Sequence, residues 1–342
     1  MGHIKKDNHY VPQAYLRQWA VEGKISTYRL LVPHEKCALW KSHSPSSIAK
    51  HQHLYTYFSG TEDSDEIERW LDRDFENPAI PSIAKVVRED RLHPEDWQKL
   101  FRFAVATSVR TPAGLEHFMK RQSETLPSFL NETLQASVAK YESAIKAGIK
   151  LQSTPIDDSL NKLPLKVQRV NHEDGTAVVQ AKILNGRKMW IWHLRHVLTK
   201  TINRLPKYRW TILHAPNGVS WPTSDNPLVK LSINAQNQYH FDGGWATPGV
   251  ELLLPLSPKH LLYTRVGSTR PPLRGTILSE QKARFFRKII LERARRYIFA
   301  TDPEEIDRIR PRTVSQEWCT QEAETWANWH KQQSKEEAEY PD

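Results

Sequence analysis

The chain is poor in cysteine and in long apolar segments. Its 342 residues include two cysteines, Cys37 and Cys319, which excludes a disulfide framework and an all-cysteine metal site within one chain. No run of 18 apolar residues occurs, and the first ten residues lack the apolar segment of a signal peptide. Because membrane insertion and export need such segments, we expect a cytoplasmic protein with no membrane partner.

Signatures of several enzyme classes are also missing. The sequence contains neither a Walker A motif nor the glycine fingerprint of a dinucleotide-binding fold, which argues against ATP-driven and nicotinamide chemistry. It contains no internal repeat, which argues against a solenoid. With 39% hydrophobic residues, the chain is long enough for one large domain or two ordinary ones.

Positive charge is in excess and unevenly distributed. The formal net charge is +10, but residues 302–342 hold eleven acids against five Lys or Arg, which leaves about +16 on the first 301 residues. A basic body is compatible with a polyanionic partner such as nucleic acid, whose binding would depend on salt concentration. It is equally compatible with a solvated basic surface.

The spacing of apolar residues predicts both strands and helices. Alternation favours strands at 24–31 and 53–58. Helical spacing starts at Asp63, and Pro78 and Pro81 should break that helix. Further helices are expected at 93–110, at 113–150 with an interruption at Pro127, and at 187–205.

The last third is expected to form a sheet that is closed by a basic helix. Short apolar segments at 208–214, 251–258 and 260–265 indicate strands, and residues 280–296 form a basic amphipathic pattern. The sequence thus predicts an α+β fold with a small N-terminal strand-containing lobe, a central helical block and a C-terminal antiparallel or mixed sheet.

We expect one integrated domain over residues 1–300. Sub-lobes 1–152 and 165–300 would flank the turn-rich segment 153–164, the one boundary that the composition indicates. Residues 301–342 would form an acidic extension, partly disordered after about residue 330 because of its charge.

Near the start, the segment DNHYVPQAYLRQW (7–19) leads a polar triplet into a short helix. Pro12 suits the first helical position, so His9 should lie just outside the helix N-terminus. There its ring could act as a cap-like partner, as a buried hydrogen-bonded group or as a general base. The two structural roles are favoured.

Residues 9–19 resemble the N-terminal signature of the bacterial DUF4238 family. This chain has Trp19 where a Phe is more usual in that signature. Three later segments are similar to landmarks of the same family and occur in the same order, namely SVRTP (108–112), TSDNPL (223–228) and LLLPLSPKHLL (252–262). The family's function is unknown, so the resemblance implies kinship over most of residues 7–300 and leaves the reaction open. The positions that it implies are His9, Pro12, Tyr15, Leu16, Arg17, Arg110, Pro112, Asp225, Asn226 and Pro227.

Among these positions, Arg110 and Asp225 have the side chains best suited to binding or catalysis. Arg110 lies away from the apolar stripe of its helix, where it could bind a phosphate or carboxylate, or form an ion pair with Asp225 or a helix C-terminus. Asp225 should lie at a strand end, where it could hold a metal, orient His9 or form an Asx turn. Convergence of His9, Arg110 and Asp225 would supply a base, an anion clamp and an acid or metal ligand, which suits phosphodiester cleavage.

Two hypotheses follow. The first is an enzyme that acts on a phosphate-bearing substrate, such as a nuclease, with a divalent metal as a compatible cofactor. Its catalytic residues would be those three, and its substrate contacts would be Arg17, Asn226, Lys282, Arg284, Arg287 and Lys288. The alternative is a non-enzymatic module that binds nucleic acid or protein, in which the polar landmarks form a structural network. An open cleft around the landmarks would favour the enzyme, and their burial would favour the module.

Other motifs are weaker. DNHYVP superficially resembles the start of an HNH nuclease motif, but no later Asn and His follow at the required spacing. SDNPL lacks the second proline and the aromatic residue of the amino-methyltransferase motif. His193 and His196 have a spacing that could hold Zn²⁺, although solvated residues are favoured. The oligomeric state is left open.

Overall fold

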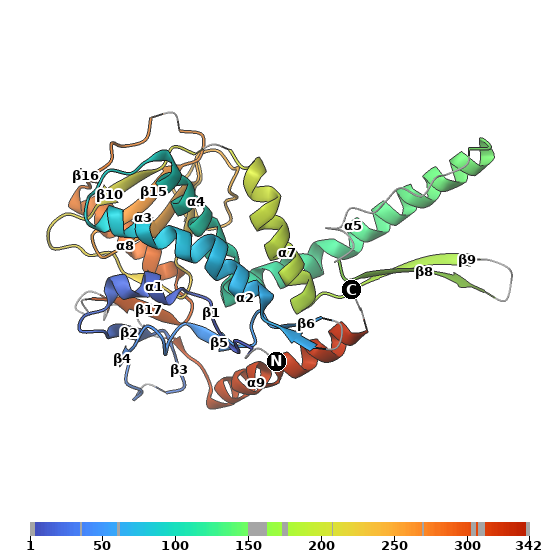
Figure 1. Cartoon of the computed structure of the whole chain (residues 1–342), viewed down its shortest axis with the longest axis horizontal. Helices are drawn as coiled ribbons and strands as arrows, with labels where there is room; N and C mark the ends of the chain where they lie inside the picture. Colours follow the sequence, from blue (N-terminus) through green and yellow to red (C-terminus); the bar gives the residue numbers. More distant parts are fainter. Residues whose placement is uncertain are drawn as a thin grey trace.

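The computed structural model describes residues 4–34, 36–59, 62–149, 163–172, 177–206, 208–268, 270–301, 306 and 312–339. Figure 1 shows a body of sheets and helices from which two elements project, the long helix α5 (Pro112–Lys146) and the hairpin of β8 (Leu165–Asn171) and β9 (Ala177–Ile183). Helices and antiparallel or mixed sheets occur together, so the expected α+β class is confirmed. Residues 153–162 of the expected boundary lie outside the described part of the chain.

The largest sheet has six strands and lies between two helical layers. Its order is β13 (Tyr239–His240), β12 (Val229–Ile233), β14 (Glu251–Pro255), β15 (His260–Arg265), β10 (Thr211–His214) and β16 (Thr276–Ile277). Leu213 and Leu261 pack on one face with Phe286 of helix α8 (Glu280–Arg293). Ile212 and Leu262 belong to the main core on the other face. Such burial on both faces explains why these strands have nearly continuous apolar sequences.

A four-stranded sheet joins the N-terminus to residues near 300. Its order is β11 (Thr223–Ser224), β17 (Tyr297–Ala300), β2 (Ile25–Arg29) and β4 (Trp40–His43). The remaining short strands pair as β1 (Asp7–His9) with β5 (Lys50–Gln52), β3 (Leu31–Val32) with β18 (Arg312–Thr313), and β6 (Tyr57–Ser59) with β7 (Glu62–Ser64). The N-terminal landmark segment and the TSDNPL segment therefore lie in neighbouring parts of the body.

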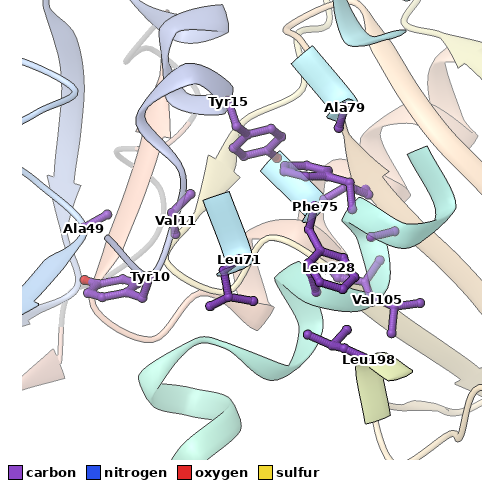
Figure 2. Packing of buried hydrophobic residues seen from close by; sticks show 14 of the residues in the cluster. Tyr10, Val11, Tyr15, Ala49, Leu71, Phe75, Ala79, Val105, Leu198 and Leu228 are labelled. Atoms are coloured by element: carbon purple, nitrogen blue, oxygen red, sulfur yellow. The ribbon is translucent and has the colours of Figure 1, made fainter. Parts of the chain in front are cut away.

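The main core connects this N-terminal region to the central helices. Figure 2 shows part of the cluster, in which Tyr10 and Val11 share one apolar interior with Leu71, Phe75 and Val105. The first motif also contributes the short helices α1 (Gln13–Leu16) and η1 (Arg17–Trp19), which bury Tyr15, Leu16 and Trp19. Each large apolar side chain buried in this way contributes about 1.5–3 kcal/mol to folding.

The central helices follow the predicted order, but the expected break at Pro78 and Pro81 is wrong. α2 (Glu66–Leu71) continues through a π-helical turn (Asp72–Glu76) into α3 (Asn77–Val87). Pro78 closely follows the π-helical turn, and Pro81 lies inside α3 without ending it. α4 (Pro94–Val109) matches its prediction, and its N-terminus is closed by a capping box between His93 and Asp96.

Two other local predictions also fail. α5 runs through Pro127 without interruption. The proline removes one helical hydrogen bond, and the carbonyl that loses it belongs to Ser123, an exposed residue, where water can replace the donor. Residues 53–56 form a turn between β5 and β6 rather than a strand, with His53 at a φ of 54°. The amide of Tyr55 donates to the Asn8 side chain at 3.0 Å, so it does not need a neighbouring strand.

The C-terminal segment is helical where its charge predicted disorder. After α7 (Arg187–Thr199) and η3 (Thr201–Arg204), the last described helix is α9 (Gln316–Ala338), which lies along the lower edge of the body in Figure 1. Arg187 binds the carboxylate of Glu337 through two hydrogen bonds of 2.8 and 2.6 Å, and both side chains are fully buried. The acidic charge of α9 is thus partly neutralised by the basic body, which corrects the expectation of disorder after about residue 330. None of the described helices has the length and apolar content to cross a membrane.

Candidate functional site

Arg110 is the centre of a buried polar network. It caps the C-terminus of α4, and its side chain is 1% exposed. Its guanidinium donates to the Glu76 carboxylate, to the backbone carbonyl of His9 and to the Tyr55 hydroxyl, while Glu68 lies 3.7 Å away. Burial acts to lower the pKa of Arg110, but the charge of Glu76, with Tyr55 and Glu68, keeps the pKa above its usual value.

The partners of Arg110 therefore differ from those that the sequence suggested. Neither Asp225 nor a free helix end holds the guanidinium; two carboxylates from the α2–α3 region do. Both acids are visible in the sequence of residues 63–77, but their selection depends on how α2 and its π-helical continuation pack against α4. The three landmark motifs gave no signal for them.

His9 serves the same network through its backbone, and its ring has structural partners. The ring nitrogen Nε2 donates to the carbonyl of Ser46 at 3.2 Å, so Nδ1 accepts from the Gln13 amide at 3.4 Å. Burial lowers the pKa of His9, with the nearby cations Lys50, Lys5 and Arg110 acting in the same direction. A neutral, hydrogen-bonded ring is the result.

Asp225 connects three segments of backbone. Its carboxylate oxygens accept from the amides of Arg295 and Arg296, each at 2.9 Å, and its own amide donates to the carbonyl of Tyr297. Burial raises the pKa of Asp225 to about 6, and the hydrogen bonds from the two amides limit the rise. The adjacent Asn226 is also buried, and its side chain donates to the carbonyl of Arg293.

His9, Arg110 and Asp225 thus do not face one open cleft, but their motifs meet at a pocket of about 330 Å³. We call it the motif pocket. Tyr10 of the first motif, Pro112 of the second and Asp225 of the third line it, together with Lys50, Arg295 and Arg296. The lining includes neither His9 nor Arg110.

Each cation of the motif pocket is balanced by a carboxylate. Lys50 binds Asp7 at 2.6 Å, and Arg295 binds Glu116 at 2.6 Å. Arg296 forms a two-pronged pair with Glu322 of α9, with one contact at 2.9 Å. α9 also places Trp326 in the pocket lining, where its ring contacts that of His51. The pocket can therefore accept an anion only by exchanging ion pairs.

The basic helix α8 presents less free charge than its sequence suggested. Its surface cations pair with nearby acids, Lys282 with Glu251, Arg284 with Glu280 and Lys288 with Glu292. Arg287 was expected to contact a substrate, but it is buried and donates to the carbonyl of Ser220. Its position on the apolar side of α8 makes it part of the packing against the sheet. Arg17 is exposed on η1 and does not line the motif pocket.

The histidine pair considered for metal binding, His193 and His196, packs against aromatic rings instead. His193 stacks on Phe118 with a centroid separation of 4.5 Å, and His196 stacks on Trp192 at 5.1 Å. Burial lowers the pKa of His193 to about 4. Both rings are half-buried rather than solvated as expected, because α7 packs between α5 and the body.

Two groups of side chains within the described residues have metal-ligand character. In the first, His330 lies 3.0 Å from Asp63, and its other ring nitrogen accepts from Arg187 at 2.9 Å. A positive guanidinium bound to the same ring disfavours a cation there, so this group is a polar contact between α9 and the body. The second group is formed by Glu89, His214 and His260.

The comparisons agree with the motif resemblance. A family model described as "Protein of unknown function (DUF4238)" matches residues 7–304. No curated protein and no solved structure was found to match the chain. Because the family model covers nearly all of the body, the chain belongs to the DUF4238 family.

Proposed function

We propose that the protein binds a phosphate-bearing ligand in the motif pocket. The observation that carries this proposal is the meeting of three family motifs, far apart in the sequence, around one pocket with three cations in its lining. A volume of about 330 Å³ lies within the range of small-ligand sites. Nucleic acid and nucleotides are the first ligand class to test, because the body is basic.

Ion-pair exchange supplies the chemistry of binding. The guanidinium of Arg296 is planar and already holds both oxygens of the Glu322 carboxylate. Phosphate offers the same two-oxygen geometry with more negative charge, so it can replace Glu322 without rearrangement of the arginine. Trp326 adds a half-buried aromatic ring on which a base can stack.

Binding is favoured over catalysis by the three polar landmarks. His9 and Arg110 are buried, their polar atoms have partners within the network, and neither side chain lines the pocket. Burial of the landmark side chains was expected for a structural network and an open cleft for an enzyme, so this arrangement supports a structural network. One observation favours an enzyme as the second candidate: Asp225 lines the pocket with a pKa of about 6, which suits an acid–base group near neutral pH.

A binding and cleavage assay on the full chain tests both candidates. Labelled single-stranded DNA, double-stranded DNA and RNA are titrated at two salt concentrations, with wild type, Arg296→Gln and a matched control, Arg284→Gln. The control removes the same charge from α8, where Arg284 pairs with Glu280 outside the pocket. We expect Arg296→Gln to weaken binding by about tenfold, the scale of one charge-assisted hydrogen bond, and the control to change it by less than about twofold.

Equal losses in both variants would mean nonspecific attraction and would overturn the pocket as the site. Absence of binding by any of these polymers and by free nucleotides would overturn the ligand class. The same pool incubated with Mg²⁺, Mn²⁺ or Zn²⁺ tests cleavage, and Asp225→Asn serves as the comparison. Cleavage that this variant loses while it stays folded and still binds would establish the enzyme.

A further inference from the structure

The group Glu89, His214 and His260 is built by the six-stranded sheet and the end of α3. His214 ends β10 and His260 starts β15, and the two residues are direct partners in the antiparallel register. Side chains alternate along a strand, so both histidines lie on the face of Ile212 and Leu262, which belongs to the main core. Glu89 follows α3 closely. Three segments that are distant in sequence thus bring three metal-ligand side chains together.

The donor atoms are close to coordination distance. Oε1 of Glu89 lies 3.9 Å from Nδ1 of His214 and 3.8 Å from Nε2 of His260. All three donor atoms lie within 4.8 Å of one another, and the imidazole rings are nearly perpendicular. Ligands at bond lengths near 2.1 Å around one ion are roughly 3–4 Å apart, so small side-chain rotations complete the site.

His260 provides an independent sign of a ligand. Its side chain is 4% exposed, and Nε2 makes no hydrogen bond to any described residue. Nδ1 lies 2.7 Å from Oγ of Ser257, which also accepts from the amides of Lys259 and His260. This contact at Nδ1 fixes the orientation of the ring and directs Nε2 toward Glu89. Metal-binding histidines are commonly oriented by such a hydrogen bond from the other ring nitrogen.

The backbone at Glu89 has a conformation that glutamate rarely adopts. Its amide donates to the carbonyl of Val86 at 3.0 Å, and the amide of Asp90 donates to the carbonyl of Lys85 at 2.9 Å, which together form a Schellman motif at the end of α3. Glu89 occupies the left-handed position of that motif with a φ of 62°, where glycine is the usual residue. A glutamate therefore occupies a strained position close to two histidines.

We propose that Glu89, His214 and His260 bind a divalent first-row transition metal ion such as Zn²⁺. Two imidazoles and one carboxylate suit Zn²⁺ and its neighbours better than Mg²⁺ or Ca²⁺, which prefer oxygen ligands. Glu89 is 66% exposed and His214 is partly exposed, so one side of the ion faces solvent. This leaves coordination positions for water, as in sites that activate a water molecule or a substrate. The site shares no residue with the lining of the motif pocket, and the inference is independent of the proposed function.

Metal titration of the untagged full chain tests the site. The protein is treated with a chelator, dialysed and titrated with Zn²⁺ by calorimetry, and Co²⁺ is added separately to record its ligand-field absorption. The variants are Glu89→Gln, which changes an exposed side chain, and His214→Ala. The matched control is His240→Ala, which removes a half-exposed imidazole next to Asp242 on another part of the sheet.

We expect wild type and His240→Ala to bind one Zn²⁺ per chain at this site. Glu89→Gln and His214→Ala should bind Zn²⁺ at least tenfold more weakly and should lose or change the Co²⁺ absorption spectrum. Circular dichroism confirms that the variants are folded. Failure of wild type to bind Zn²⁺ or Co²⁺ at micromolar concentration would overturn the proposal. Binding that Glu89→Gln and His214→Ala leave unchanged would also overturn it, and loss of that binding in His53→Ala would place the ion at the group of His53, Asp63 and His330.

Discussion

Replacement of Arg110 is the sharpest test of the buried network. The guanidinium is 1% exposed and compensates Glu76 and Glu68, which are themselves largely buried. In Arg110→Met the apolar part of the side chain is kept, but the two carboxylates and the carbonyl of His9 lose their donor. Removal of one partner from a buried ion pair costs about 3–5 kcal/mol, so we expect the free energy of unfolding to fall by that amount.

The assay is urea unfolding followed by tryptophan fluorescence, at pH 7.5 and at pH 4.5. Burial raises the pKa of Glu68 even when Arg110 is present. An acid whose pKa is higher in the folded than in the unfolded protein contributes less to the free energy of unfolding as the pH rises, because folding disfavours its charged form. Without Arg110 this loss should be larger, so the deficit of Arg110→Met should shrink as the pH falls from 7.5 to 4.5.

Two further variants isolate the cause. Arg110→Met combined with Glu68→Gln and Glu76→Gln removes the uncompensated charges and should recover at least half of the lost stability. Arg88→Met is the matched control, because Arg88 is an exposed helix-end arginine that pairs with Asp90, and its loss should cost less than about 1 kcal/mol. If Arg110→Met were as stable as this control, the network would not be structural.

The other predictions concern the motif pocket. Asp225 has a pKa of about 6 in the folded protein against 3.8 for a free side chain, so its contribution to the free energy of unfolding should fall by ~2 kcal/mol as the pH rises from 4 to 6. Asp225→Asn should show a flatter dependence over that range in urea titrations, and an unchanged slope would contradict the raised pKa. Glu322→Gln should free the guanidinium of Arg296 and tighten binding of labelled oligonucleotides several-fold. Glu317→Gln is its control, since Glu317 is an exposed acid in the first turn of α9, and equal tightening by both variants would reduce the effect to general charge.

The elements that the sequence predicted well are those with a strong local pattern. α4 has an apolar stripe and a capping box, and both β14 and β15 are short apolar segments bounded by turn residues. Their structure depends on residues within a few positions, so periodicity was sufficient. The prolines misled the prediction because their cost depends on context: Pro78 follows a π-helical turn, and Pro127 lies in a solvent-exposed part of α5.

The site could be predicted only in part. The motifs named Tyr10, Pro112 and Asp225 or their immediate neighbours, and these residues meet at one pocket. The partners of Arg110 could not be chosen, because several acids compete in the sequence and tertiary packing selects two of them. His260 lies in the landmark segment 252–262, but its pairing with His214 could not be predicted, since only the antiparallel register of β10 and β15 makes them neighbours.

Helix α9 lies outside the part of the chain that the family model covers, but it contributes to the motif pocket. The family model ends at residue 304, whereas Glu322 and Trp326 of the motif pocket belong to α9. The two halves of this helix are held unequally. Its C-terminal half is anchored by the fully buried pair of Arg187 and Glu337, and breaking such a pair costs about 3–5 kcal/mol.

The N-terminal half of α9 is held near the pocket by Arg296 and Glu322, whose side chains are 28% and 22% exposed and whose contact is therefore weakened by solvent and salt. A phosphate that competes for Arg296 should release this half first, while the anchored half stays in place. In that case Glu322→Gln changes ligand affinity with little effect on global stability, and hydrogen exchange should increase in the first turns of α9 but not around Glu337 when the ligand binds. Uniform exchange along the whole helix would mean that α9 moves as one unit and that the buried pair does not anchor it.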